Sequence, residues 1–204
     1  MLRVFNPATG AVVKEITEDT AESVADKYQR ARAAQRDWSA VPLKKRIDCV
    51  QRFRALIADR LEQLAQTLTA EVGKPIKQSR NELNGLFARI DFFCENAERA
   101  TRAEAITTTG ATHEWISHQP LGVIANVSAW NYPYYVGGNV ILPALLTGNC
   151  VLYKPSEFAT LTGMAIGAML HLAGVPKEAF QVVCGLVGAE VVKQPIDGLF
   201  FTAV

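Results

Sequence analysis

Short apolar runs alternate with helix-like segments over roughly the last eighty residues, and this alternation constrains the fold more than any other feature of the sequence. Strands are expected at 123–127, 149–153, 181–184 and 199–202, and helices at 140–146 and 161–172. Alternation at these lengths is typical of right-handed βαβ units, whose strands lie parallel. The sequence therefore predicts an α/β fold with an open parallel sheet in its C-terminal part.

The first hundred residues follow a helical period instead. The spacing of their apolar side chains predicts long helices over 20–39, 47–68 and 83–97. Asp19 and Glu22 resemble a capping pair for the first helix, and the second is expected to bend near Asp59. The opposite face of the third helix carries charged side chains that we expect to be solvated, namely Glu82, Arg89, Glu95 and Arg99.

Two short strands around a turn are predicted at 106–118. The run from Ile106 to Thr109 and the run from His113 to His118 both have an extended pattern, and Gly110 lies in the turn between them. This small β-hairpin separates the helical part of the chain from the alternating part. We expect it to form an extension of the fold.

The charge balance excludes partners that bind through net charge. Lys and Arg total 21 and Asp and Glu total 20, which leaves a net charge of +1. The chain therefore offers no electrostatic case for nucleic acid or for an anionic membrane, and a small molecule or another protein chain is the expected partner. No apolar stretch reaches the ~20 residues that span a bilayer, and the first residues lack the pattern of a signal peptide. A cytoplasmic location is expected.

The cysteines show no spacing that suggests a metal or disulfide framework. The four of them lie scattered through apolar segments, at Cys49, Cys94, Cys150 and Cys184. We expect free, mostly buried thiols and no metal site. Cys184 comes closest to the helix-start setting of a reactive thiol, although a structural role is favoured.

The strand at 123–127 runs directly into Trp130 and Asn131. Its β-branched residues fit a strand that is covered on both faces, and open α/β sheets bind ligands just beyond the carboxyl ends of their strands. We therefore expect Trp130 and Asn131 to lie at a site of binding or chemistry. Tyr134 and Tyr135 come next, and they either line a substrate entrance or pack at the start of a helix.

The second predicted strand ends in Lys154, Ser156 and Glu157, so two strand ends converge on one edge of the sheet. Lys154 supplies a cation with three donors. Glu157 can accept from a vicinal diol, as the acidic residue of a dinucleotide site does from a ribose. The alternative is a surface lysine and glutamate that flank a turn, and the residue types do not decide between the two.

Evidence for a phosphate-binding loop is thin. The Gly-x-Gly-x-x-Gly pattern is absent. The nearest candidate contains Gly185 and Gly188, where a strand meets a short helix whose N-terminus favours an anion. Two glycines three positions apart are also typical of a tight turn, so both interpretations stay open.

Ordered motifs occur along nearly the whole chain. Those in the C-terminal half are Pro120-Leu121-Gly122-Val123, Trp130-Asn131-Tyr132-Pro133, Pro143-Ala144-Leu145, Gly148-Asn149, Lys154-Pro155-Ser156-Glu157, Ala173-Gly174-Val175-Pro176 and Phe200-Phe201-Thr202. Asn6-Pro7-Ala8-Thr9-Gly10 and Glu71-Val72-Gly73-Lys74-Pro75 precede them. Together they resemble the N-terminal, cofactor-binding portion of the aldehyde dehydrogenase superfamily.

The resemblance implies a part in NAD(P)-dependent oxidation of an aldehyde to a carboxylic acid through a cysteine thiohemiacetal. Asn131 matches the residue whose side-chain amide donates to the oxyanion, a role that suits a neutral donor fixed at a strand end. The positions that match cofactor-binding residues are Val127, Ser128, Ala129, Trp130, Lys154, Ser156, Glu157, Gly185 and Gly188. The carboxylate of Glu157 would repel a 2′-phosphate, so NAD is expected, with NADP as the alternative.

The resemblance also divides the chain into three parts. Residues 1–105 are expected to form the helical part of the cofactor-binding domain. Residues 106–118 match a bridging hairpin that packs against neighbouring subunits of a homo-oligomer. Residues 119–204 are expected to form a Rossmann-like NAD(P)-binding core that is incomplete at its C-terminus.

The chain departs from the family pattern near its end. Ala203 and Val204 replace a glycine and a serine, and the segment from Gly185 to Gly188 is shortened. The family's nucleophilic cysteine and glutamate base are expected beyond residue 204, so the chain alone is expected to be inactive. A truncated, non-catalytic dinucleotide-binding or assembly module is the alternative function.

Overall fold

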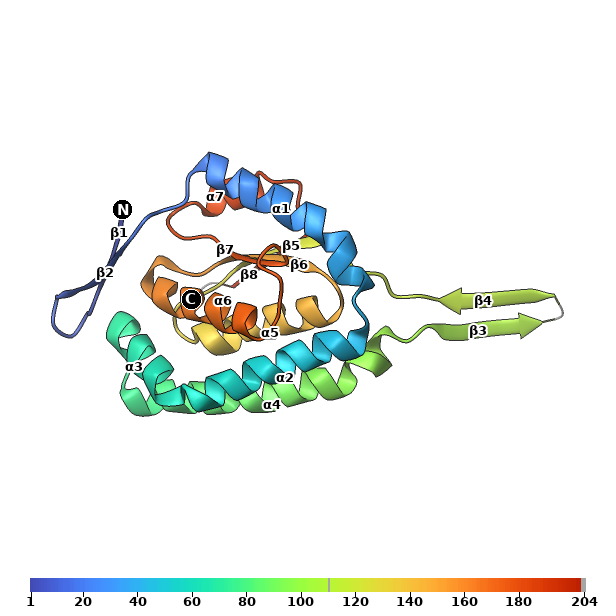
Figure 1. The fold of residues 1–204 in the computed structure, drawn as a ribbon, viewed down its shortest axis with the longest axis horizontal. Helices are drawn as coiled ribbons and strands as arrows, with labels where there is room; N and C mark the ends of the chain where they lie inside the picture. Colours follow the sequence, from blue (N-terminus) through green and yellow to red (C-terminus); the bar gives the residue numbers. More distant parts are fainter. Residues whose placement is uncertain (110, 203–204) are drawn as a thin grey trace.

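The computed structural model describes residues 1–109 and 111–202. It confirms the predicted α/β architecture, in which a parallel sheet has helices on both faces and a long hairpin projects from one end (Figure 1). The predicted turn residue Gly110 and the departures at Ala203 and Val204 lie outside the described residues.

Four parallel strands form the central sheet in the order β7-β6-β5-β8. Their bounds are β5 Val123–Val127, β6 Cys150–Lys154, β7 Phe180–Val182 and β8 Gly198–Phe201. Every residue of β6 is buried, as expected for a parallel strand that is covered on both faces. All the predicted strands of this sheet are confirmed, with small shifts at their ends.

The helices pack around the sheet in layers (Figure 1). One face is covered by α5 (Pro133–Leu146) and α6 (Thr160–Leu172), and the other by α1 (Ala21–Ala40) and the short α7 (Gly188–Val192). Outside α5 and α6 lie α2 (Leu43–Asp59), α3 (Leu61–Val72) and α4 (Ile76–Thr101). The break between α2 and α3 confirms the predicted bend. In the part of the chain that the structure describes, no helix is long and apolar enough to cross a membrane.

Helix α5 begins at Pro133 rather than at the predicted residue 140. Proline is favoured in the first turn of a helix because the N–H that it lacks would have no partner there. Gly138 weakens the helical pattern of the sequence, but it allows α5 to approach α4 closely. A Cβ at this position would lie 2.7 Å from Leu86 Cδ1, so the glycine serves the packing between the two helices.

The predicted capping pair of α1 is wrong. Thr20 is the N-cap, its hydroxyl accepts from the Ser23 N–H, and Ser23 Oγ accepts from the Thr20 N–H. Asp19 instead binds the Lys27 ammonium at 2.6 Å and the backbone N–H of Cys184 at 2.7 Å. These contacts fasten the start of α1 to the loop that follows β7.

An antiparallel hairpin at the N-terminus corrects the prediction that the first hundred residues are helical. It consists of β1 (Leu2–Phe5) and β2 (Val12–Ile16). Val4 and Ile16 are its only fully buried residues, so the sequence lacks the alternation that reveals a strand. The turn does carry a signal, because the Asn6 side chain accepts from the backbone N–H two residues later.

The hairpin predicted at 106–118 is confirmed as β3 (Glu104–Thr109) and β4 (Thr112–Ile116), which extend away from the body of the molecule (Figure 1). Its apolar side chains are open to solvent, with Ile106 55% and Trp115 64% exposed. A bridging role for this hairpin stays a prediction.

Gly163 on α6 packs against the loop that follows β6, and its replacement is expected to destabilise the fold. A Cβ there would lie 2.5 Å from Pro155 Cγ. We expect Gly163→Ala to lower the free energy of unfolding by about 1–3 kcal/mol, measured by urea denaturation. Gly85→Ala on α4 is the matched control, since its Cβ would have an ordinary contact at 3.6 Å. Equal effects of the two substitutions would contradict the packing argument.

Candidate active site

The carboxyl ends of β5 and β6 lie next to each other. Val127 and Lys154 are the last residues of the two strands and are paired in register. The chain that leaves β5 is held on both sides, because the Ser128 N–H donates to the Lys154 carbonyl at 3.0 Å and the Ala129 N–H donates to Thr202 Oγ1 at 3.2 Å. The two predicted strand-end segments therefore share one edge of the sheet.

Lys154 and Glu157 form a loose pair at this edge. The side chain of Lys154 is 8% exposed and that of Glu157 is 31% exposed, with Nζ and Oε2 3.5 Å apart. Ser156 Oγ donates to the same carboxylate oxygen and accepts from the Phe158 N–H. Because Lys154 is buried, a surface lysine that merely flanks a turn is excluded. The cation and the carboxylate both keep capacity for further hydrogen bonds.

Trp130 and Asn131 occupy the loop between β5 and α5. Trp130 is partly exposed and packs edge-on against Phe158, with ring centroids 6.4 Å apart, so the loops after β5 and β6 touch. Asn131 is half-buried, and its Oδ1 accepts from the Tyr132 N–H at 3.0 Å. Within residues 1–109 and 111–202, Nδ2 of Asn131 makes no hydrogen bond, which leaves the amide able to donate.

A buried ion pair lies directly beneath this loop. Lys74 and Glu82 meet at 2.6 Å, with side chains 8% and 0% exposed. The prediction that Glu82 belongs to a solvated face is wrong, because α5 packs on that face of α4 and the Tyr134 N–H donates to Glu82 at 2.7 Å. Burial raises the pKa of the Glu82 carboxyl, and the Lys74 ammonium opposes that rise. The Gly73-Lys74-Pro75 motif before α4 is the feature of the sequence that points to Lys74.

Glu71 is a second buried carboxylate that the sequence did not reveal. It is 4% exposed and lies on α3. Its oxygens accept from the N–H groups of Leu161 and Thr162, at 2.8 and 2.6 Å, and from the Thr162 hydroxyl. Burial raises its pKa to about 7, against the lowering effect of these hydrogen bonds. Glu71 thus caps α6, the helix that follows the loop after Lys154.

Tyr134 packs at the start of α5 and does not line an entrance, since it is 1% exposed. Six buried side-chain polar atoms have no hydrogen-bond partner among the described residues, and four of them belong to β5, β6 and the segment from Ser128 into α5: Asn126 Oδ1, Ser128 Oγ, Tyr134 OH and Tyr153 OH. Burial raises the pKa of both tyrosines, so their phenols stay neutral.

The loop after β7 fits the tight-turn interpretation. Gly185 has φ of +107°, and a Cβ there would lie 2.9 Å from Glu18. The Glu18 carboxylate also accepts from the Leu186 N–H at 3.4 Å, so an acidic side chain already lies against this turn. A Cβ at Gly188 would meet nothing within 4 Å, so packing does not require a glycine at that position.

The thiols are unsuited to nucleophilic attack. All four cysteines are free and buried, as predicted. Burial raises the pKa of Cys94 to about 11 and that of Cys150 to about 12, and it also raises the pKa of Cys184. A reactive cysteine needs a lowered pKa. In the described ranges, no group of three or more His, Cys, Asp and Glu is arranged to hold a metal ion.

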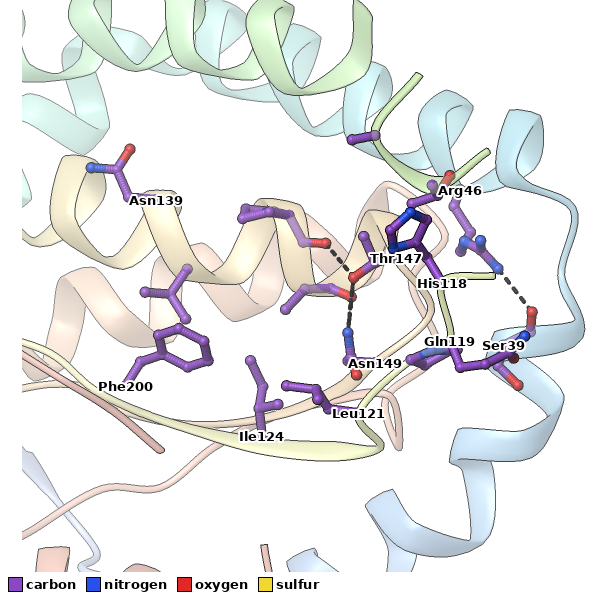
Figure 2. Close-up of a pocket in the computed structure, with 16 residues that line it drawn as sticks. Ser39, Arg46, His118, Gln119, Leu121, Ile124, Asn139, Thr147, Asn149 and Phe200 are labelled. Atoms are coloured by element: carbon purple, nitrogen blue, oxygen red, sulfur yellow. Dashed lines mark hydrogen bonds between the residues drawn. The ribbon is translucent and has the colours of Figure 1, made fainter. Parts of the chain in front are cut away.

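One large cavity lies away from the predicted site. Figure 2 shows this space of about 630 Å³, lined by residues such as Arg46, Leu121 and Asn149 near the start of β5 and the end of α5. A second cavity, of about 410 Å³, includes Trp130 and Glu157. All four residues of β1 line the same cavity, which places this unpredicted strand beside the strand-end loops.

Comparison with known proteins gives a consistent match. Residues 1–203 match the model of the "Aldehyde dehydrogenase family". The chain is 34% identical over 184 residues to 3,6-anhydro-alpha-L-galactose dehydrogenase of Streptomyces coelicolor, covering 90% of this chain and 37% of that protein. It is 35% identical over 201 residues to N-succinylglutamate 5-semialdehyde dehydrogenase of Burkholderia mallei, covering 97% and 41%.

A solved structure gives the same picture. NADP-dependent glyceraldehyde-3-phosphate dehydrogenase from Bacillus halodurans, complexed with NADP, superimposes with a TM-score of 0.91 at 30% identity, covering 98% of this chain and 44% of that one. The chain thus spans about 40% of the length of the curated relatives it matches, 37% and 41% in the two named above. The match in sequence and the match in fold both extend over nearly the whole of this chain.

Proposed function

The chain belongs to the aldehyde dehydrogenase family, and we propose that it supplies the NAD(P) site and one oxyanion donor for oxidation of an aldehyde to a carboxylic acid. The observation that carries this proposal is the contact between the two strand-end loops, where Trp130 packs on Phe158. It brings Asn131 to the same edge of the sheet as Lys154 and Glu157. Parallel α/β sheets bind ligands at such an edge.

The cofactor residues are assigned by position and chemistry. Lys154 and Glu157 offer a donor and an acceptor for ribose hydroxyls, and their long contact of 3.5 Å leaves both available. The remaining assignments lie at the strand ends or in the loops just after them, namely Val127, Ser128, Ala129, Trp130, Ser156, Gly185 and Gly188. When bound, the dinucleotide supplies the nicotinamide that accepts hydride.

Asn131 is assigned to the developing oxyanion. Its Oδ1 is bound to the Tyr132 N–H, which fixes the carboxamide and turns its two N–H donors away from the backbone. A preorganised neutral donor stabilises negative charge as it forms on the aldehyde oxygen. We assign the attacking thiolate to none of the four cysteines, because all of them are buried.

Calorimetric titration with NAD and with NADP tests the cofactor site, and an assay with a panel of aldehydes tests the reaction. We expect saturable binding by the full-length protein and formation of reduced cofactor that depends on the aldehyde. Absence of binding of either dinucleotide would exclude the proposed site.

Glu157→Gln is expected to shift the preference between the two cofactors toward NADP. A carboxylate near the ribose repels a 2′-phosphate, and at a partly exposed position two charges a few ångströms apart interact by about 1 kcal/mol. The ratio of the dissociation constants for NADP and NAD should fall about 5-fold. Glu178→Gln, an exposed carboxylate outside the site, is the control, and an unchanged ratio in the Glu157 variant would contradict the assignment.

A dinucleotide-binding module without catalysis of its own is the second candidate function. The burial of all four thiols and the raised pKa of three of them favour it for the 204-residue chain. An assay of aldehyde turnover by the 204-residue chain alone distinguishes the two functions. Turnover would rule out a binding module without catalysis.

The hairpin of β3 and β4 is proposed as an oligomer contact. Its exposed apolar side chains, among them Trp115 and Ile116, are typical of surfaces that pack against another chain. A homo-oligomer of the full-length protein is expected in light scattering.

A further inference from the structure

Lys74 is held in place by the backbone around it. It lies between α3 and α4, after Gly73 with φ of +80° and before Pro75. A Cβ at Gly73 would lie 2.4 Å from Pro7 Cγ, so only glycine fits this turn. The main chain therefore presents the Lys74 side chain in one direction, toward the loop between β5 and α5.

The Lys74 ammonium binds that loop at Asn131. Its Nζ donates to the backbone carbonyl of Asn131 and to Glu82 Oε2, and it lies 4.2 Å from the centre of the Tyr132 ring. The contact uses the main-chain oxygen of Asn131 and does not involve its carboxamide. Since Nζ is buried, water does not compete for the carbonyl.

Glu82 holds the other side of the same loop. Its Oε1 accepts from the Tyr134 N–H at 2.7 Å and from the Tyr135 N–H at 3.3 Å. The N-cap residue of α5 is Tyr132, whose side chain makes no capping hydrogen bond, so Glu82 supplies the cap from α4. The backbone is thus anchored at Asn131 and again three residues later.

We infer that the buried Lys74–Glu82 pair positions the carboxamide of Asn131, and that both residues control the rate of aldehyde oxidation through it. This inference rests on the proposed role of Asn131. The loop between β5 and α5 has no other charged contact among the described residues, so the pair is its charged restraint at Asn131, beside the backbone hydrogen bonds of Ser128 and Ala129 at the start of the loop. The effect is specific to Asn131 and differs from a general contribution to stability.

A double-mutant cycle in the full-length protein tests the inference. The variants are Lys74→Met, Asn131→Ala and the combination of the two, with the exposed Lys77→Met on α4 as the matched control. A misplacement of a reacting group by about 1 Å can cost about 10²-fold in rate, so Lys74→Met should lower kcat about 10- to 100-fold. In the Asn131→Ala background, the same substitution should lower kcat less than about 3-fold.

Other readouts separate positioning from stability. Lys74→Arg, which keeps the charge and the donors, should recover at least part of the lost kcat. The dissociation constant of the cofactor should not change in any Lys74 variant. If Lys74→Met does not fold, Glu82→Gln replaces it in the same cycle, since that variant keeps an oxygen for the Tyr134 N–H.

Each outcome gives a decision. Equal losses of kcat in both backgrounds, or no loss in the Lys74 variant, would overturn the inference. A full-length protein without turnover would refute the proposed function instead, and crystal structures then decide about positioning. If the Asn131 carboxamide is displaced in the structure of Lys74→Met but not in that of Lys77→Met, the inference is supported. If the carboxamide keeps its position in both structures, the inference is overturned.

Discussion

Under the proposed function, Asn131→Ala in the full-length protein is expected to turn over an aldehyde about 10²- to 10³-fold more slowly than the wild type, the usual cost of removing one oxyanion donor. The reason is geometric, because Asn131 lies at the strand edge with its Oδ1 bound to the Tyr132 N–H, and its amide donors have no partner among the residues that the structure describes. Alanine removes the donor and leaves the charge of the site unchanged. Steady-state kinetics that follow the reduced cofactor provide the measurement.

The loss should be confined to the chemical step. Cofactor affinity is assigned to Lys154 and Glu157, so the dissociation constant of NAD(P) should stay within about twofold. Asn139→Ala is the matched control, because this asparagine lies on α5, beyond the loop that contains Asn131, and lines the cavity of Figure 2. A normal kcat in Asn131→Ala would remove Asn131 from the mechanism.

The sheet could be predicted because its strands are buried on both faces. Residues 150–154 of β6 are all buried, and such strands appear in the sequence as short apolar runs between helices. The N-terminal hairpin could not be predicted in the same way. Its strands bury one residue each, Val4 and Ile16, which is too few to give an alternating pattern.

The strand-end residues of the site were also predictable, but the groups that hold them were not. Glu71 and Glu82 lie on amphipathic helices, where a carboxylate normally faces solvent. Whether it does so depends on which element packs against that face, and here the N-termini of α6 and α5 do. Burial of a charge is therefore a property of the tertiary contact and not of the local pattern.

One structural rule connects these two carboxylates. Each strand-end loop leads into a helix that lacks a side-chain cap of its own, since Tyr132 and Ala159 are the N-cap residues of α5 and α6. Glu82 caps α5 and Glu71 caps α6 from the neighbouring helices. Carboxylates are favoured at helix N-termini. The outer helices thus hold both loops of the candidate site in place.

Raising the pH from about 5 to 8 is expected to lower the stability of the protein through Glu71. Burial raises the pKa of this carboxyl in the folded protein to about 7, from 4.5. Between these values the folded chain keeps a proton that the unfolded chain releases, so folding takes up a proton and stability falls as the pH rises. The contribution is fully present below pH 4.5 and is lost as the pH passes about 7; a shift of this size corresponds to about 3 kcal/mol.

Glu71→Gln removes the titrating group and should remove this part of the pH dependence. Glutamine keeps one oxygen for the cap of α6 but places an amide against a backbone N–H, so the variant should be less stable at pH 5 and differ less from the wild type at pH 8. Urea unfolding at several pH values measures both curves, with the exposed Glu62→Gln on the same helix as control. Parallel curves for Glu71→Gln and the wild type would show that Glu71 is ionised throughout, in which case the three hydrogen bonds from α6 outweigh its burial.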